Sequence, residues 1–226
     1  MTRHLLTEEL ERGLDHILAS PQDGGRLELI VRRPEVDTRE SLDEGRLDVD
    51  QGLVGDNWLS RGSRHMPDGA ADPDMQLNIM NSRVAALVAD DPARRELAGD
   101  QLYLDMDLSY ENLPAGTRLA LGDAVIEVTE PRHTGCRKFA ERFGKEAEAR
   151  AYTDQLERNG GLPASIVTRI RQVVDGAENR SGSARRGAGV RRRTGTASGW
   201  RSRCRHGGEL RGGRAGFFFR VRGPQV

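Results

Sequence analysis

The sequence predicts an α+β fold that is rich in β-strands and has only a few helices. Short apolar or alternating runs recur between residues 27 and 174, and Gly, Asp and Asn residues separate them. Such runs with frequent turn residues are typical of antiparallel sheets. Helical periodicity is confined to short stretches, and the regular strand–helix alternation of a parallel sheet is not found. We therefore expect a barrel-like sheet with a few peripheral helices.

The N-terminal part of the chain contains one expected helix and one expected strand. Apolar residues with helical spacing predict a helix over residues 7–18. Residues 27–32 predict a strand that stops near Pro34. Residues 45–58 follow, and their glycines and Asp56-Asn57 pair favour tight turns.

The next expected elements are two strands with a helix between them. Residues 76–80 predict a short strand, and Asn81 or Ser82 is placed to cap the helix that follows. Apolar and polar residues alternate over residues 101–108, so one face of this strand is expected to be buried.

A hairpin and a helix complete the part that carries the candidate site. Residues 117–129 predict a hairpin, because Gly122-Asp123 is a two-residue turn signal. The sequence becomes helical after Cys136, and residues 163–174 favour one last strand.

Charge divides the chain into an acidic body and a basic tail. Residues 1–179 contain 22 Lys and Arg against 34 Asp and Glu, whereas residues 180–226 contain 13 Arg, one Glu and no Lys. The tail is rich in Arg, Gly and Ser and has few aliphatic residues. It lacks the apolar surface that would offset the entropy of ordering, so we expect it to be disordered. The domain is therefore expected to span residues 1–179.

Two interpretations of the tail compete. Clustered arginines neutralise phosphates, which would make the tail an arm that binds nucleic acid. The absence of Lys, the isolated Trp200 and Cys204 and the Phe217-Phe218-Phe219 triplet are instead typical of GC-rich sequence translated out of frame. We favour the second interpretation or an unspecific linker, so nucleic acid is not an expected partner of the body.

Composition favours a cytoplasmic protein. No apolar run approaches the roughly 20 residues that a membrane span needs, and the N-terminal residues lack the apolar core of a signal peptide. Two cysteines in a chain of 226 residues do not form a disulfide framework. We therefore expect reduced thiols and no membrane partner.

Cys136 is the candidate catalytic residue. Arg132, His133, Arg137 and Lys138 surround it, and cations near a thiol favour its nucleophilic thiolate form. Three interpretations remain open from the residues alone. The cysteine is a small buried hydrophobe, a nucleophile of the phosphatase type, or a soft metal ligand or sulfur carrier.

The phosphatase interpretation depends on the spacing between Cys136 and Arg142. A thiolate and an arginine separated by five residues can attack and hold a phosphate. The mechanism also needs a loop whose backbone N–H groups surround the phosphate. Residues 137–141 contain no glycine and favour a helix instead, so we regard this spacing as a coincidence.

Several short motifs occur in a fixed order from residue 52 to residue 136. They are Gly52-Leu-Val-Gly55-Asp56, Gln76-Leu-Asn-Ile, Gly99-Asp100-Gln101-Leu102, Tyr110-Glu111-Asn112-Leu113, Leu121-Gly122-Asp123-Ala124, Pro131-Arg132 and Gly135-Cys136. In this order the chain resembles the MOSC family, which is named after the C-terminal part of molybdenum cofactor sulfurase. The resemblance covers residues 27–144, and residues 122–136 are its most specific part.

The resemblance implies a MOSC-type β-barrel that binds the molybdenum cofactor, with Cys136 as molybdenum ligand or persulfide carrier. It implies further cofactor-binding residues, which are Arg132, His133, Glu111, Asn112 and Asp56. An arginine suits the terminal phosphate of the cofactor's pterin, because a guanidinium can bind phosphate through two hydrogen bonds. Asn112 and Asp56 are also explained as turn formers, which is the simpler interpretation.

The sequence also departs from the family. The family usually continues with another strand and another Gly-Asp turn after the cysteine helix, whereas this chain runs into the Arg-rich tail, so we expect an incomplete barrel. No pyridoxal phosphate domain of the large sulfurases is visible. A separate cysteine desulfurase or an electron-donor protein would therefore be the expected partner.

The functional hypothesis is a molybdenum-cofactor-dependent transferase or oxidoreductase. It would act in sulfur transfer or in the reduction of N-hydroxylated compounds through Cys136. The alternative is a non-enzymatic carrier of the cofactor, and the cysteine-dependent phosphatase is the third hypothesis.

Overall fold

The computed structural model describes residues 3–131, 136–147, 167–173 and 181–193. Contacts within the chain divide it into two units, residues 1–194 and 195–226. All of the described residues belong to the first unit.

Seven of the described strands form a closed ring, because the first strand pairs with the last one. Around the ring they are β1 (Gly25–Arg32), β11 (Gly189–Arg192), β7 (Arg118–Leu121), β8 (Ala124–Val128), β9 (Val167–Val173), β5 (Leu77–Asn81) and β6 (Leu102–Asp105). The β5–β6 pair is parallel, and the other neighbours in this ring are antiparallel. A ring of this kind removes the open edges that a flat sheet would present.

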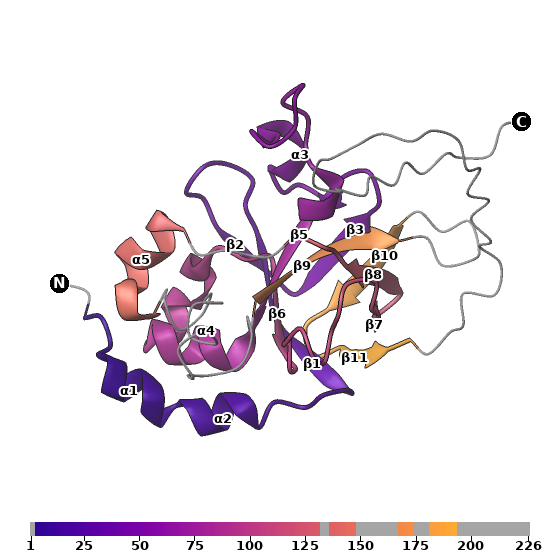
Figure 1. Cartoon of the computed structure of the whole chain (residues 1–226). Helices are drawn as coiled ribbons and strands as arrows, with labels where there is room; N and C mark the ends of the chain where they lie inside the picture. Colours follow the sequence, from indigo (N-terminus) through magenta and orange to yellow (C-terminus); the bar gives the residue numbers. More distant parts are fainter. Residues whose placement is uncertain (1–2, 132–135, 148–166, 174–180, 194–226) are drawn as a thin grey trace, which may run out of the picture. The chain divides into compact units, whose positions relative to one another are not determined.

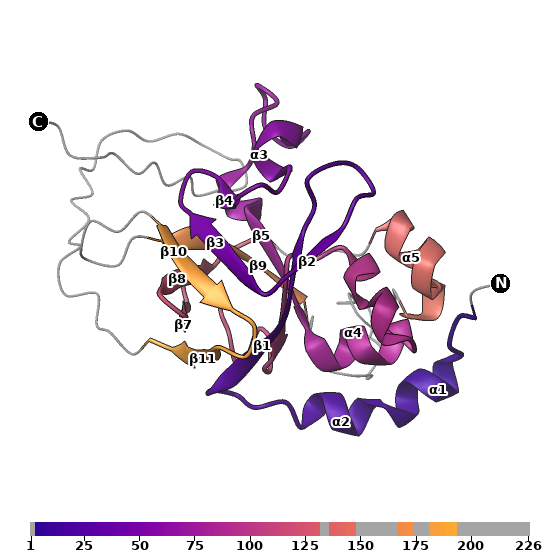
Figure 2. The same cartoon turned by 180° about the vertical axis from the view of Figure 1, so that it is seen from behind.

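A smaller sheet lies beside the ring (Figure 2). It contains β10 (Ser181–Arg185), β3 (Glu44–Asp48) and β4 (Gly52–Leu53), which pair in that order. The short strand β2 (Glu40–Leu42) pairs with the C-terminal end of β1. The loop between β1 and β2 therefore starts and ends at neighbouring strands, which fixes both of its ends.

Strand alternation sorts the side chains of β6 and the residues after it between two cores. Leu102, Leu104, Met106 and Leu108 are buried inside the barrel. Tyr103 points to the other face and packs in a second core with residues of the helices. The predicted alternation over residues 101–108 is thus confirmed, and both faces of the strand are buried.

The helices α1 (Thr7–Arg12), α2 (Leu14–Leu18), α4 (Ser82–Ala89) and α5 (Arg137–Phe143) lie together on one side of the barrel (Figures 1 and 2). The helix α4 begins where predicted, because the Asn81 side chain accepts hydrogen bonds from the backbone N–H groups of Arg83 and Val84 at 2.8 and 3.4 Å. A 3₁₀ helix, η2 (Pro92–Ala98), follows α4. Helix α3 (Trp58–Arg61) and the 3₁₀ turn η1 (Pro73–Met75) lie between β4 and β5 in the sequence.

The predicted hairpin is confirmed as β7 and β8. Gly122 stands in its turn with a φ of 58°, a conformation that favours glycine. A Cβ atom at this position would lie 2.4 Å from the backbone oxygen of Ser183. The glycine therefore permits both the turn and the close approach of β10.

The fold class is confirmed as a β-rich α+β barrel with few helices. Two expectations about its C-terminal part are wrong, namely that disorder begins at residue 180 and that the barrel is incomplete. The described part of the chain includes two strands, β10 and β11, inside the segment that we assigned to a disordered tail, and β11 completes the ring. Composition misled the prediction because backbone pairing with existing strands needs few apolar side chains. Here Ala184 and Val190 alone join the barrel core. The disorder expected over residues 194–226 lies outside the described residues.

Among the described residues, no helix is long and apolar enough to cross a membrane.

Candidate functional site

A cavity of about 340 Å³ lies between the β1–β2 loop and helix α5. Residues from distant parts of the chain line it: Arg33, Glu35, Val36, Asp37, Arg39, Asn57, Arg61, Asn78, Ala98, Gly99, Asp100, Cys136, Lys138 and Arg142. Its volume is within the range of small-molecule sites. The cavity therefore brings the candidate cysteine together with five cationic side chains.

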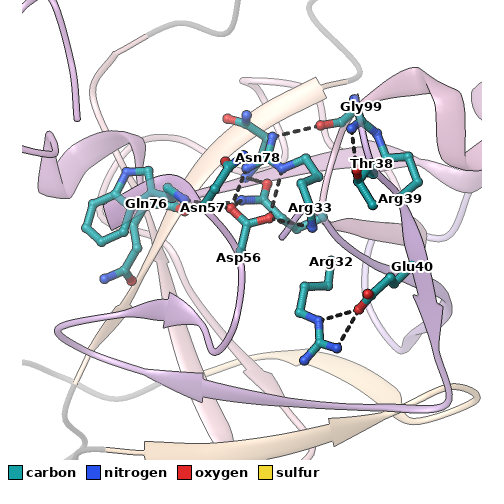
Figure 3. A network of polar contacts seen from close by, with 12 residues as sticks. Arg32, Arg33, Thr38, Arg39, Glu40, Asp56, Asn57, Gln76, Asn78 and Gly99 are labelled. Carbon is teal, nitrogen blue, oxygen red and sulfur yellow. Dashed lines mark hydrogen bonds and ion pairs between the residues drawn. The ribbon is translucent and has the colours of Figure 1, made fainter. Parts of the chain in front are cut away.

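Arg33 is held in the wall by a buried ion pair with Asp56 (Figure 3). Its Nε and Nη2 atoms donate to the two oxygens of Asp56, each at 2.9 Å. Its Nη1 donates to the backbone oxygen of Gly99, also at 2.9 Å. The Asp56 side chain is fully buried and that of Arg33 is 8% exposed. This geometry fixes the guanidinium between the end of β1 and the start of β6.

Asp56 also organises the turn that contains it. Its oxygens accept hydrogen bonds from the backbone N–H groups of Arg33 and Trp58, both at 3.0 Å. The Nε2 atom of Gln101 donates to it at 3.4 Å. The carboxylate thus supports the cavity from behind, and it is not among the lining residues.

Asp100 is the buried carboxyl group of the cavity. It is 1% exposed and follows Gly99, whose φ of 101° ends the η2 helix in a left-handed turn. Burial raises the pKa of Asp100 to about 7, although the charges of Arg33 and Arg39 act in the opposite direction. This carboxyl therefore changes its charge near neutral pH.

Arg39 and Arg61 add two further guanidinium groups, of which Arg39 is half-buried and Arg61 is more exposed. Burial, followed by repulsion from Arg142 and Arg33, lowers the pKa of Arg39. Burial and then Arg33 lower the pKa of Arg61, and Asp56 opposes them. Within the described structure, the buried Nε of Arg39 donates no hydrogen bond. A bound anion would relieve the repulsion and supply an acceptor.

Helix α5 carries the cysteine and two further cations. Cys136 is its exposed N-cap residue, and Lys138 and Arg142 follow on the helix. Both cations bind the same oxygen of Asp37, with the Lys138 Nζ at 2.6 Å and the Arg142 Nη2 at 3.1 Å. The hydrogen bond from Lys138 is the first cause that lowers the pKa of Asp37. The β1–β2 loop is thereby fastened to the helix that presents the thiol.

The structure brings together only some of the predicted site residues. Cys136 lines the cavity, and Asp56 supports it through Arg33. Arg132 and His133 lie outside the described residues. Glu111 is exposed, and neither it nor Asn112 lines the cavity.

Asn112 is a buried turn residue at another place in the fold. Its Nδ2 donates to the backbone oxygens of Gln22 and Asp107 at 2.9 and 2.8 Å. Its Oδ1 accepts from the Nη1 of Arg192 at 3.2 Å. These contacts connect the turn before β7 with strand β11, which matches the turn-former interpretation.

Four lining residues of the cavity were not predicted from the sequence as site residues: Arg33, Arg39, Arg61 and Asp100. Asp100 lies in a recognised motif, Gly99-Asp100-Gln101-Leu102, and was used only for the resemblance. Arg33 gave a weaker signal, because it follows a predicted strand directly and strand ends are common positions for site residues. Arg39 lies in the β1–β2 loop and Arg61 is the last residue of α3, and neither gave a signal in the sequence.

The lining residues favour an anion and a soft group over a hard metal ion. In the described part of the chain, no three His, Cys, Asp or Glu side chains converge as a metal site would require. The cations can instead bind a negatively charged group, and the thiol can bind a soft metal atom that belongs to the same group. The fold and the site therefore define a β-barrel protein with a cysteine at a cationic cavity.

No protein-family model and no curated protein matches the sequence. Solved structures resemble the chain at low identity. A hypothetical protein is 21% identical with a TM-score of 0.44, over 74% of this chain and 66% of that one. YiiM from Escherichia coli is 19% identical with a TM-score of 0.43, over 75% and 70%. The YuaD protein from Bacillus subtilis is 13% identical with a TM-score of 0.48, over 74% and 93%.

All of these identities are low and all of the TM-scores are below 0.5. The similarities therefore carry no inference about activity, which depends on the residues of this chain.

Proposed function

We propose that the chain is a MOSC-type protein that binds the molybdenum cofactor and uses Cys136 as a molybdenum ligand or persulfide carrier. The activity would be sulfur transfer or the reduction of N-hydroxylated compounds. The observation that carries the proposal is the position of the exposed Cys136 in the same cavity as Arg33, Arg39 and Arg61.

The donor set fits the cofactor in two respects. A thiolate is a ligand that soft and borderline transition metals accept. The cofactor also carries a phosphate, and desolvated guanidinium groups bind phosphate through planar, charge-assisted hydrogen bonds. Arg39 has such a donor within the cavity, because its buried Nε makes no hydrogen bond to the described residues.

The residues of this chain would divide the work as follows. Arg33, Arg39 and Arg61 would bind negative charge, and Asp56 would hold Arg33 in place. Cys136 would supply the sulfur atom, and Asp37 would keep the β1–β2 loop close to α5 through Lys138 and Arg142. The bound cofactor would supply a metal that accepts or donates sulfur or electrons. A separate desulfurase or electron-donor protein would serve as partner, and a cytoplasmic location would suit a free thiol.

The test compares the wild type with Cys136→Ser after both are supplied with the cofactor under anaerobic conditions. Molybdenum is measured by elemental analysis, and pterin is measured by fluorescence after oxidation. We expect the variant to lose most of the bound molybdenum and to keep part of the pterin, because the arginines still bind the phosphate. Equal molybdenum retention by both proteins would exclude the ligand role of Cys136.

A matched cysteine variant shows whether a loss of molybdenum is specific to the Cys136 thiol. Cys204 is the second cysteine of the chain, so Cys204→Ser is the same chemical change at the other thiol. This variant is expected to retain molybdenum like the wild type. Retention of both molybdenum and pterin without turnover of sulfur or N-hydroxylated substrates would favour the alternative, a cofactor carrier.

The phosphatase hypothesis receives less support from the same geometry. Helix α5 begins directly after Cys136, so residues 137–141 form helical turns and provide no loop of free N–H groups around a phosphate. Phosphoester turnover that is lost in Arg142→Ala would restore that hypothesis.

A further inference from the structure

The cationic cavity contains a carboxyl group whose charge is set by its burial. Asp100 is 1% exposed, lines the cavity and follows the last turn of η2. Its ionised form places a negative charge near Arg33 and Arg39, both of which interact with it electrostatically. A carboxylate and a bound anion would therefore compete for the same two guanidinium groups.

The groups around Asp100 come from each element of the cavity wall. They are Arg33 after β1, Asp37 and Arg39 in the β1–β2 loop, Tyr103 on β6, and Lys138 and Arg142 on α5. Glu35, Arg61 and Cys136 complete the charged and titratable lining. Burial and then the Asp100 charge raise the pKa of Tyr103, so its phenol stays neutral. Bonds from Lys138 and Arg142 keep Asp37 ionised.

We propose that this cavity binds a doubly charged oxyanion together with one proton, and that the Asp100 carboxyl accepts the proton. In this step the Asp100 carboxylate gains an O–H bond, and the anion itself forms no covalent bond. The proton comes from solvent, and the neutral carboxyl leaves Arg33 and Arg39 to the anion.

Thermodynamic linkage gives the direction of the effect. A bound anion disfavours the ionised form of a nearby carboxyl and therefore raises its proton affinity. By reciprocity, protonated Asp100 raises the affinity for the anion by the same factor. Because the pKa of Asp100 is about 7, anion affinity is expected to fall between pH 6 and pH 8.

The ligand class is a sulfate- or phosphate-type oxyanion. Its source is either the phosphate of a bound cofactor or a free anion. This inference rests on the proposed function for its physiological ligand, but its test uses inorganic sulfate and no cofactor. Failure of the sulfate test would leave the molybdenum result unaffected, and the reverse also holds.

Isothermal titration calorimetry with sodium sulfate at pH 6, 7 and 8 provides the test, at constant ionic strength. Sulfate remains doubly charged over this range, so its own titration does not contribute. Two buffers with different ionisation enthalpies report the protons taken up on binding. We expect the wild type to bind sulfate up to about tenfold more weakly at pH 8 than at pH 6, as a coupling of one pKa unit gives. Proton uptake should be largest near pH 7.

Three variants locate the effect. Asp100→Asn mimics the neutral carboxyl and is expected to bind sulfate equally at all three pH values without proton uptake. Asp100→Ala is a second neutral variant with the same expected result. Asp37→Asn removes a carboxylate of the same cavity and should keep the pH dependence, because Asp37 does not titrate in this range.

Asp37→Asn has a second expected effect. It removes the negative charge that is paired with Lys138 and Arg142, so sulfate should bind roughly two- to fivefold more tightly at each pH. Asn tolerates the φ of 63° that residue 37 adopts, and its amide oxygen can accept the hydrogen bonds from Lys138 and Arg142, so the loop is expected to stay attached to α5. Cys136→Ser should also keep the pH dependence, which excludes the thiol as its source.

Sulfate binding by the wild type that does not change with pH would overturn the proposal. Unchanged pH dependence in both Asp100 variants would overturn it as well, and so would the absence of sulfate binding at pH 6. A competition experiment then identifies the source of the anion, with inorganic phosphate or a phosphate monoester displacing bound ³⁵S-labelled sulfate. A phosphate monoester that displaces sulfate better than inorganic phosphate favours the cofactor's phosphate, and the opposite order favours a free anion.

Discussion

Arg33 and Asp56 form a buried ion pair between the end of β1 and the turn that precedes α3. Two side-chain hydrogen bonds of 2.9 Å join them, and the backbone N–H of Arg33 donates a third at 3.0 Å. The pair connects residues that are far apart in the sequence and orients a guanidinium toward the cavity. It therefore links the stability of the barrel to the geometry of the candidate site.

Asp56→Asn is expected to destabilise the protein by about 3–5 kcal/mol, because it leaves the Arg33 charge buried without its partner. The free energy of unfolding in urea provides the measurement. Glu44→Gln is the matched control, since it breaks the exposed Arg185–Glu44 pair of the smaller sheet. An exposed pair contributes at most about 1 kcal/mol, so equal losses in both variants would contradict the structural role of Asp56.

Stability should depend on pH through Asp100. The pKa of this carboxyl is 3.8 in its ordinary state and about 7 in the folded protein. Between these values the folded state holds a proton that the unfolded state has lost, so stability falls as pH rises toward 7 and then levels off. Asp100→Asn removes the titrating carboxyl and with it this pH-dependent contribution to stability.

The stability advantage of Asp100→Asn over the wild type should grow by roughly 2–3 kcal/mol from pH 5 to pH 8. Urea unfolding at four pH values measures the difference. Two curves that run parallel over this range would show that Asp100 is ionised in the folded protein, as in the unfolded chain.

Truncation tests the role of the last two strands. A chain that ends at residue 180 lacks β10 and β11, which opens the ring between β1 and β7 and removes Val190 and Ala184 from the core. Full burial of one valine side chain alone stabilises a fold by about 1.5–3 kcal/mol. We expect this chain to lose its cooperative thermal transition, measured by circular dichroism.

A chain that ends at residue 193 retains both strands and is expected to melt as the full chain does. The chain that ends at residue 193 also tests whether the Arg-rich segment is an arm that binds nucleic acid. If single-stranded nucleic acid binds the full chain, a salt titration should show whether residues 194–226 carry that binding. Equal melting of both truncated chains would contradict the closing role of β11.

Much of the fold is visible in local patterns. The alternation that places Leu102, Leu104 and Met106 in the barrel core depends only on the period of an extended strand. The Asn81 cap and the Gly122-Asp123 turn are likewise decided by a few adjacent residues. These elements could be predicted because their physical causes act within a short stretch of chain.

The candidate site was predictable only in part. Cys136 stood out because its cationic neighbours are adjacent in the sequence. Its link to Arg33, Arg39 and Asp100 could not be predicted, because these residues are far from Cys136 in the sequence and meet it only in the folded chain. For Asn112 the sequence offered a cofactor-binding role and the simpler role of a turn former, and its hydrogen bonds connect the turn to β11.

The sequence by itself determined the β-rich class of the fold, the positions of most strands and the cysteine around which a function can be proposed. Tertiary structure alone decided that β11 closes the ring and that Asp100 is buried in the same cavity as Arg33 and Arg39. The reason is physical: strand periodicity and turn preference are local properties of the chain. Burial, and with it the pKa of a carboxyl, depends on which distant segments surround it.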